Sequence, residues 1–502
     1  MDINELLSEA ISGQSAGRPA DSTPADAPPS SAAPRVSAYP AAPSDGSGFV
    51  TPDPLTTTPA ERMAIGESVR KAIPREVLGE WDPPANRPDP VQQLIEQSRT
   101  RVPELVPVRY GRMSVSPFTY LRGSPVVMSR DLGNAPSTPL RTQLCGDAHL
   151  SNFGAYGTPE RNLVFDLNDF DETLPGPFEW DVKRLVTSFV IAARTSGQGE
   201  DAGRRAAFAV AKAYRENIRR HAEADVMDIW YEHIVLDDAM AGFAGIVSPK
   251  KLAKSLAKTR HRTSSQVLTK LTEIVDGERR IRHQPPLLIP LEAPEWREIA
   301  VEVLSRYVSS LTFEHRQLVQ RFHQVDLAVK VVGVGSVGTR CLIVLLHGRD
   351  EDDVLFLQIK EAEQSVLAPW AGASEFAHQG ERAVVGQRLM QAASDVFLGW
   401  TVGPAGRYYY IRQLRDMKGS VDVDALPPEG LVVYGELCGR TMARAHARSA
   451  DPVAIAGYLG KAERFEESMQ SFAVAYSEQV EADFVRFTQA IDSGEIPAEL
   501  GL

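Results

Sequence analysis

The stretch RTQLCGDAHLSNFG, residues 141–154, and the stretch NLVFDLNDFDE, residues 162–172, decide how this chain is interpreted. In both, a short apolar run that favours a β-strand leads into acidic and amide side chains. Turn capping accounts for one or two of these residues, but not for the whole group of Asp147, Asn152, Asp166, Asp169, Asp171 and Glu172. Their oxygens suit Mg²⁺, which keeps one or two protein carboxylates and takes its other ligands from water and phosphate. An aspartate that binds no metal can orient or deprotonate an attacking hydroxyl.

Composition and charge limit the class of protein. The chain has 502 residues, which is enough for two or three ordinary domains or for one two-lobed enzyme. With 43% hydrophobic and 24% charged residues, the composition suits a soluble globular protein with a large core. The net charge of −12 argues against a general binder of nucleic acid or of anionic membranes. The three cysteines, Cys145, Cys341 and Cys438, have no metal-ligand spacing, so we expect reduced thiols. The N-terminus resembles no secretory signal and no apolar run has membrane-spanning length, which predicts a cytoplasmic protein without a membrane partner.

Four segments follow from the patterns along the chain. Residues 1–58 are rich in Ala, Pro and Ser and are predicted to form a disordered tail. Residues 59–325 are predicted to contain the acidic loop (residues 145–152) and then, from residue 201 onward, an almost wholly helical region that is interrupted near residues 248–249 and by RHQPPLLIP, residues 282–290. Residues 326–418 are β-branched and punctuated by glycine, which predicts a small lobe of antiparallel strands, and residues 419–502 return to helix. The sequence therefore predicts an α+β fold.

Local patterns also predict individual elements. Apolar periodicity predicts helices at residues 61–73, 90–101, 179–195, 375–393, 431–449 and 458–491. Strands are predicted at residues 141–143, 163–165, 354–362, 395–402 and 407–414, and on both sides of GVGSVG, residues 333–338, which we call the Gly-rich loop.

GDAHLSN, residues 146–152, resembles the catalytic loop of aminoglycoside- and choline-kinase-like phosphotransferases. The resemblance implies that Asp147 is the catalytic aspartate, that His149 is the loop histidine and that Asn152 is a magnesium ligand.

DFDETLPGPFEWDVKRL, residues 169–185, is similar to the metal-aspartate segment of the same enzymes. The resemblance implies that Asp169 is a metal ligand and that Asp181 is the later aspartate of the following helix. Asp166 competes for the metal role, because its distance from Asp147 fits the usual loop length at least as well.

A second resemblance covers more of the chain. GDAHLSNFG, FDLNDFDE and RQLRDMKGS resemble a large bacterial family of unknown function, from about residue 101 to the C-terminus. That family is grouped with the kinase-like superfamily, so the resemblance implies a fold more firmly than a substrate.

The nucleotide side of such an enzyme is expected in residues 326–418. Within the Gly-rich loop, Gly333, Gly335, Ser336 and Gly338 would let backbone N–H groups approach phosphate oxygens closely. The motif alone is weak, and a dinucleotide-binding loop is excluded because this one precedes a strand rather than opening a helix.

Lys360 follows on the next predicted strand, where the resemblance implies that it bridges the α- and β-phosphates of ATP. The alternative is a lysine that keeps a strand edge soluble. We expect Lys360 to pair with a helix glutamate, Glu381 or else Glu375, and we expect Gln413 and Leu414 beside the adenine.

The order of these parts is reversed relative to ordinary kinases, because Asp147 precedes the Gly-rich loop. GRTMARAHARS, residues 439–449, resembles the LGRALARLHA helix that normally leads directly into the catalytic loop, but more helix follows it here. We therefore expect a circularly permuted, two-lobed protein-kinase-like fold with a small antiparallel β N-lobe and a mainly helical C-lobe.

The resemblance implies an ATP- and Mg²⁺-dependent phosphotransferase with a hydroxyl acceptor, and His149 favours a small molecule over a protein. A catalytically silent nucleotide-binding protein and an AMP transferase remain alternatives. A metallophosphoesterase would need GDxxD- and GNH-like ligand segments that the sequence lacks.

Several other residues have two interpretations. Arg109, Arg112 and Arg122 either bind phosphate or pair with carboxylates, and we expect the second role for at least two of them. We expect His446 to be packed and Tyr408–Tyr410 to be strand core. The basic run at residues 248–262 is either a solvated helix face or a surface for a phosphate-rich partner.

Overall fold

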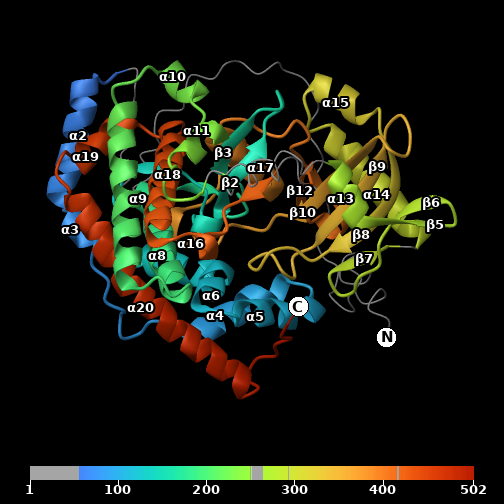
Figure 1. Ribbon diagram of the computed structural model, residues 1–502, viewed down its shortest axis with the longest axis horizontal. Helices are drawn as coiled ribbons and strands as arrows, with labels where there is room; N and C mark the ends of the chain where they lie inside the picture. Colours follow the sequence, from blue (N-terminus) through green and yellow to red (C-terminus); the bar gives the residue numbers. More distant parts are fainter. Residues whose placement is uncertain (1–55, 249, 251–263, 292, 415–417, 502) are drawn as a thin grey trace, which may run out of the picture.

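The structure is a computed structural model that describes residues 56–248, 250, 264–291, 293–414 and 418–501. The predicted disordered tail before residue 56 and nearly all of the basic run lie outside these residues. Figure 1 shows a helical part on one side and a large antiparallel sheet on the other. The fold is therefore of mixed α and β type with antiparallel sheets, as predicted. In the described residues, no helix combines the length and apolar character needed to cross a membrane.

The larger sheet has six strands within the described residues, in the order β11-β12-β10-β9-β8-β7. They are β7 (Leu288–Pro290), β8 (His323–Lys330), β9 (Cys341–His347), β10 (Val354–Glu361), β11 (Gly399–Val402) and β12 (Tyr408–Gln413). All neighbouring pairs are antiparallel. The Gly-rich loop connects β8 to β9, so the strands predicted on both sides of it are confirmed.

Alternation along β10 determines where Lys360 points. Leu357 and Ile359 pack in a buried cluster with Trp296 of α14 (Pro294–Val308), which covers one face of the sheet. Successive side chains on a strand point to opposite faces, so Lys360 lies on the other face. Its side chain is nevertheless buried. The side chain of Lys360 therefore points away from the hydrophobic cluster between the sheet and α14.

The sequence predicts an almost wholly helical region from residue 201 to residue 324, and the structure differs from this prediction. The region contains the hairpin of β5 (Thr272–Val275) and β6 (Glu278–Ile281), beside α13 (Ser264–Leu271) and α15 (Phe313–Val319). Strand β7, in contrast, lies within the expected interruption at residues 282–290. The hairpin turns at Asp276 and Gly277, which have φ angles of 52° and 82° and suit a two-residue turn. This Asp-Gly pair is the local signal that the helical interpretation missed. The expected domain boundary at residue 326 also falls inside β8.

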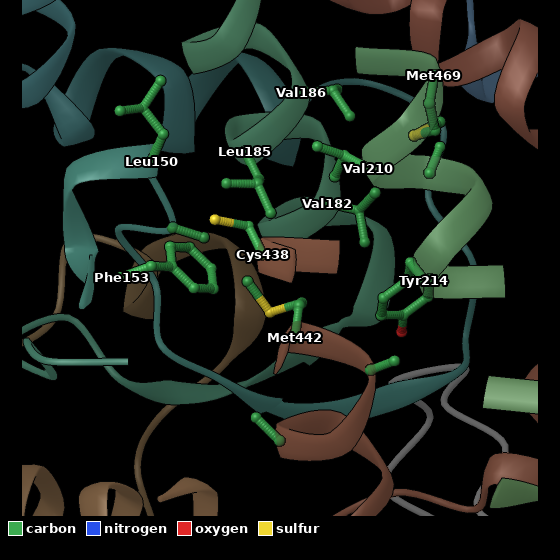
Figure 2. Packing of buried hydrophobic residues seen from close by; sticks show 14 of the residues in the cluster. Leu150, Phe153, Val182, Leu185, Val186, Val210, Tyr214, Cys438, Met442 and Met469 are labelled. Atoms are coloured by element: carbon green, nitrogen blue, oxygen red, sulfur yellow. The ribbon is translucent and has the colours of Figure 1, made fainter. Parts of the chain in front are cut away.

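The helical part consists of α8 (Phe178–Thr195), α9 (Glu200–His221), α10 (Val226–Tyr231), α11 (Leu236–Ala241), α18 (Pro428–Ala447), α19 (Pro452–Leu459) and α20 (Arg464–Asp492). The single helix predicted at residues 458–491 is interrupted, because Gly460 has a φ angle of 68° and ends α19. Figure 2 shows the core, in which Val182, Leu185 and Val186 meet Val210, Tyr214, Cys438, Met442 and Met469. Leu150 and Phe153 are buried in the same cluster, so the helical core anchors the acidic loop.

The N-terminal helices are α2 (Pro59–Ala72), α3 (Arg75–Leu78), α4 (Pro90–Gln97), α5 (Val106–Met113), α6 (Pro117–Gly123) and α7 (Pro125–Gly133). The helices predicted from residues 61 and 90 are thereby confirmed. A short helix, α16 (Ala368–Ala371), precedes α17 (Gln379–Met390), which lies between β10 and β11 in the chain.

Two small sheets hold the acidic residues. β1 (Arg141–Leu144) pairs with β4 (Leu174–Pro177), and β2 (Phe153–Gly157) lies between β3 (Leu163–Leu167) and β13 (Gly419–Ser420). The acidic loop therefore connects β1 to β2, and β3 leads directly to Asp169. Because β13 follows β12 in the chain, the chain passes here from the larger sheet to the small one.

The end of α18 lies against the strand that enters the acidic loop. Thr142 Oγ1 donates to the carbonyl oxygen of His446 at 3.2 Å, across 304 positions in the chain. The backbone N–H of Gln143 donates to Ser449 Oγ at 3.0 Å. The segment 446–449 is thus adjacent in space to the residues that precede Asp147.

Candidate functional site

Lys360 and the loop after β3 meet in space, although 191 positions separate Lys360 from Asp169. The ammonium nitrogen of Lys360 lies 3.4 Å from Asp169 Oδ2 and also forms an ion pair with Asp171. Burial alone would lower the pKa of Lys360, but the two carboxylates outweigh it and hold that pKa well above its ordinary value. Burial would likewise raise the pKa of Asp169, but Lys360 and Arg412 keep it below its usual range. Lys360, which is expected to bind phosphate, and Asp169, which is expected to bind the metal, therefore belong to one charged cluster.

Asp181 holds the start of the acidic loop. Its carboxylate accepts the backbone N–H of Cys145 at 2.8 Å and that of Gly146 at 3.1 Å. Gly146 has a φ angle of 83°, which residues with a side chain rarely adopt. His446 Nε2 lies 3.3 Å from the same carboxylate, and its Nδ1 contacts the hydroxyl of Tyr214 at 2.9 Å. His446 is thus packed, as expected, and it supports the loop through Asp181.

Asn152 ties the acidic loop to the segment of Asp169. Its amide nitrogen donates to the carbonyl oxygens of Asp147 at 3.1 Å and of Asp169 at 3.0 Å. Its amide oxygen accepts the backbone N–H of Asp169 at 2.7 Å. These bonds fix the backbones of the two expected functional aspartates relative to each other.

Asp147 is paired with an arginine that the sequence did not single out. Arg184 of α8 contacts Asp147 Oδ1 at 2.5 Å and donates to the carbonyl oxygen of Leu121 at 2.9 Å. Arg184 follows Asp181 by three positions, which places both on one helix face, so helical spacing could have indicated it. The pair fixes the orientation of the Asp147 carboxylate.

His149 is buried beside Asp147. Its Nε2 lies 3.7 Å from Asp147 Oδ2, and its ring meets the ring of Phe118 edge to face. Burial lowers the pKa of His149 to about 3, although Asp147 opposes the shift. The histidine is therefore neutral at physiological pH and is no phosphate-binding cation.

Asp166, the competing candidate for the metal ligand, bonds to other groups of the protein. Its carboxylate forms a buried ion pair with Arg444 of α18 at 2.6 Å and accepts the backbone N–H of Ala392 at 2.9 Å. In contrast, the side chain of Asp169 is 44% exposed. The geometry thus gives Asp166 a place between β3 and α18, and Asp169 a place beside Lys360.

The Gly-rich loop lies over this cluster. Gly333 and Gly338 have φ angles of 67° and 90°, and Ser336 Oγ donates to Asp171 Oδ2 at 3.3 Å. A Cβ atom on Gly335 would lie 3.0 Å from the carbonyl oxygen of Arg122 on α6. The tip of the loop therefore lies between Asp171 and the N-terminal helices.

Asp171, which the sequence grouped with the acidic residues but gave no role, is central to the site. It contacts Lys360 and Ser336, and it accepts the hydroxyl of Tyr410 at 2.8 Å. Tyr410 is 2% exposed, which agrees with the expected strand core. Asp171 therefore links the larger sheet to residues 168–172, which follow β3 and which we call the acidic segment.

The expected pairing of Lys360 with a helix glutamate is wrong within the described residues. The ion pairs of Lys360 are with Asp169 and Asp171. Glu381 lies at the start of α17, where its backbone N–H donates to His378 Nδ1, and Glu375 is exposed. The acidic segment supplies the carboxylates instead, because Asp169 and Asp171 lie beside Lys360 in the fold.

Gln413 and Leu414, expected beside the adenine, lie at the end of β12. The backbone N–H of Gln413 donates to Asp395 Oδ2 at 2.5 Å, and Leu414 packs against Phe356. Residues 415–417 lie outside the described part, and Gly419 then pairs with Ala155 on β2. The two residues thus begin the connection between the two sheets.

The family described as "Uncharacterized protein conserved in bacteria (DUF2252)" matches residues 101–490. The chain belongs to the DUF2252 family. No curated protein and no solved structure matched the chain. The DUF2252 match spans the acidic loop, the Gly-rich loop, Lys360 and the end of α18. All the residues that form the cluster are therefore part of the DUF2252 region.

The arginines at the start of the DUF2252 region differ in their surroundings. Arg109 is fully buried and donates to Ser98, Gln97 and Gly123 rather than to a carboxylate. Arg112 donates to the carbonyl oxygen of Gly333 at 2.7 Å. Arg122 lies 6.0 Å from the centre of the Phe118 ring. Arg109 and Arg112 thus both form structural hydrogen bonds, and the bonds of Arg109 go to uncharged groups rather than to the carboxylates that we expected.

Proposed function

We propose that this DUF2252 protein is an ATP- and Mg²⁺-dependent phosphotransferase of circularly permuted kinase-like fold. It transfers a phosphoryl group to a hydroxyl acceptor, with a small molecule slightly favoured over a protein. The observation that carries the proposal is the contact of Lys360 with Asp169 and Asp171 beneath the Gly-rich loop. A lysine and acidic residues that converge under a glycine-rich turn suit a metal-bound triphosphate.

The chain order supports the kinase-like part of the proposal. From β8 to β12, the chain forms a strand, the Gly-rich loop, a second strand, the strand of Lys360, the short helix α16, helix α17 and two further strands. Kinases carry a Gly-rich loop, a strand lysine and a following helix in the same order.

The contact between α18 and β1 supports the permuted connection. In the kinases that GRTMARAHARS resembles, this helix leads directly into the catalytic loop. Here His446 and Ser449 bond to Thr142 and Gln143, a few residues before Asp147. A junction between those two points would therefore restore the usual order without moving the elements far.

The residues divide the chemistry between them. Lys360 exchanges its carboxylate partners for phosphate oxygens, and the N–H groups of the Gly-rich loop hold the same triphosphate. Asp147, oriented by Arg184, accepts the proton of the acceptor hydroxyl. The bond between the acceptor oxygen and the terminal phosphorus forms as the bond to the β-phosphate oxygen breaks, which leaves ADP.

The residues around Asp169 fit a magnesium ion. The half-exposed carboxylate of Asp169 has room for a further ligand, whereas Asn152 offers its amide oxygen only if a bond to the backbone N–H of Asp169 lengthens. No three His, Cys, Asp or Glu side chains of the described residues could hold a metal together, so water and phosphate would complete the shell. Bound Mg²⁺ would neutralise phosphate charge during transfer. Asp166 is not proposed as a ligand because Arg444 already occupies it.

The variant Asp147→Asn tests this proposal. Transfer of label from γ-labelled ATP, to the protein itself or to small hydroxyl compounds of a cell extract, should fall roughly 100- to 10,000-fold. Binding of ATP with Mg²⁺, measured by calorimetry, should change little because Asp147 contacts the acceptor. The control is Asp201→Asn, a carboxylate exposed on α9.

Full transfer activity in Asp147→Asn would refute the assignment of Asp147. Label that is transferred from α-labelled ATP instead would identify an AMP transferase. Binding of ATP without transfer of either label would identify a nucleotide-binding scaffold.

A further inference from the structure

The bonding of Arg122 on α6 differs from that of the other arginines near the Gly-rich loop. Within the described residues, its guanidinium has no hydrogen bond or ion pair, and its Nε is buried and unsatisfied. The neighbouring group is the ring of Phe118, 6.0 Å away. In the same part of the chain, Arg101 and Arg112 are each bonded to a carbonyl oxygen of the Gly-rich loop. Arg122 therefore differs from the arginines that hold the structure together.

Helix α6 lies directly against the acidic loop. The carbonyl oxygen of Leu121 accepts from Arg184, which pairs with Asp147. Phe118, one turn earlier on the helix, packs its ring against His149. Leu121 and Phe118, two neighbours of Arg122 on α6, thus each contact a residue that in turn contacts Asp147.

The same helix also contacts the Gly-rich loop. The carbonyl oxygen of Arg122 would be 3.0 Å from a Cβ atom on Gly335, so the loop and α6 leave no space between their backbones. Arg122 consequently lies where the loop tip meets the acidic loop. Burial lowers the pKa of Arg122, and the charges of Asp147 and Asp169 oppose that shift, which agrees with this position.

A partly buried cation without a hydrogen-bond partner costs free energy, and a bound anion removes that cost. Guanidinium groups bind phosphate through two parallel hydrogen bonds, which makes phosphate a better match than a single carbonyl oxygen. Lys360 pairs with Asp169 and Asp171, whereas the Phe118 ring beside Arg122 packs against His149, which in turn contacts Asp147. In the proposed reaction, Asp147 marks the side on which the phosphoryl group leaves the nucleotide.

We propose that Arg122 binds the terminal phosphate of the bound nucleoside triphosphate, so that α6 supplies a phosphate-binding group from outside the strands and the acidic loop. The inference rests on the proposed function and names a binding residue that the kinase resemblance does not provide.

The experiment compares Arg122→Ala and Arg122→Lys with the control Arg99→Ala in the full chain. Arg99 lies in the same N-terminal region, and its side chain is 73% exposed. Calorimetry measures the Kd of ATP and of ADP with Mg²⁺, and a thermal melt measures the Tm of each variant without nucleotide.

In Arg122→Ala, the affinity for ATP should fall roughly 10- to 100-fold, as expected for lost hydrogen bonds to a charged group, while the affinity for ADP changes less than about threefold. The Tm without nucleotide should stay the same or rise, because an unpaired charge has been removed. Arg122→Lys should retain part of the preference for ATP, and Arg99→Ala should match the wild type.

Equal losses for ATP and ADP, or an unchanged ATP affinity, would overturn the role of Arg122 and leave the proposed function standing. A lower Tm with an unchanged preference for ATP would show a structural residue instead. A wild-type protein that binds neither nucleotide would overturn the proposed function itself.

Discussion

Glu172 follows Asp171 and lies against Gly146, at the entrance to the acidic loop. Burial, with Asp171 and Asp147 as smaller contributions, raises the pKa of its carboxyl group to about 7, while the N–H of Val366 opposes the shift. The folded protein therefore binds a proton here that the unfolded chain has released above about pH 4.5.

This proton predicts a pH-dependent stability. Because the pKa is higher in the folded state, the contribution of Glu172 is fully present below pH 4.5 and is lost as the pH rises through 7. The side chain is half-buried, so we expect about 1–2 kcal/mol rather than the full effect of the shift. Urea unfolding measures the free energy of unfolding at pH 5 and at pH 8. Between these two pH values this free energy should fall less in Glu172→Gln than in the wild type. Parallel pH profiles for both proteins would contradict the assignment.

At the scale of elements, the ion pair of Arg444 and Asp166 connects α18 to β3. Both side chains are 1% exposed, and Arg444 also donates to the carbonyl oxygen of Met390 at the end of α17. One arginine thus connects α18 and α17 to β3, from which they are more than 200 positions away in the chain. From the sequence, Asp166 is a candidate metal ligand, but its ion pair with Arg444 gives its carboxylate a structural role.

Arg444→Met should destabilise the fold by about 3–5 kcal/mol, because it leaves Asp166 buried without a counter-charge. The double variant Arg444→Met with Asp166→Asn should recover part of the loss. Arg440→Ala, on the same helix and 46% exposed, should change stability by less than about 1 kcal/mol. Chemical unfolding of the three variants measures these values, and equal losses for Arg444→Met and Arg440→Ala would disprove the role of the pair.

At the scale of the whole molecule, the site joins segments that are far apart in the chain. The Gly-rich loop bonds to the N-terminal region through Arg101 and Arg112, and to the acidic segment through Ser336 and Asp171. A ligand held there would contact both parts of the fold at once.

Hydrogen exchange should therefore report ATP binding in two places. ATP with Mg²⁺ should slow amide exchange both in the Gly-rich loop and in residues 145–152, while the β5–β6 hairpin, an exposed edge, serves as the internal control. Protection confined to one of the two segments would contradict a shared site.

Local chemistry allowed much of the fold to be predicted from the sequence. Strand and helix positions such as β1, β3, β10 and α8 follow from apolar periodicity, which acts over a few neighbouring residues. The Asp276–Gly277 hairpin shows that the same local signals also mislead when a turn lies within an apparently helical region. The candidate residues Asp147, Asn152, Asp169 and Lys360 were found from their motifs, since each motif is short and contiguous.

The sequence by itself determined which residues are available for a phosphate site: the acidic loop, the Gly-rich loop and Lys360. Only the tertiary structure decided their partners. It paired Lys360 with Asp169 and Asp171 instead of Glu381, assigned Asp166 to Arg444, and left Arg122 without a partner in the described residues. The physical reason is that a charge pair depends on distance in space and on burial, and neither is encoded by spacing along a chain when 191 positions intervene.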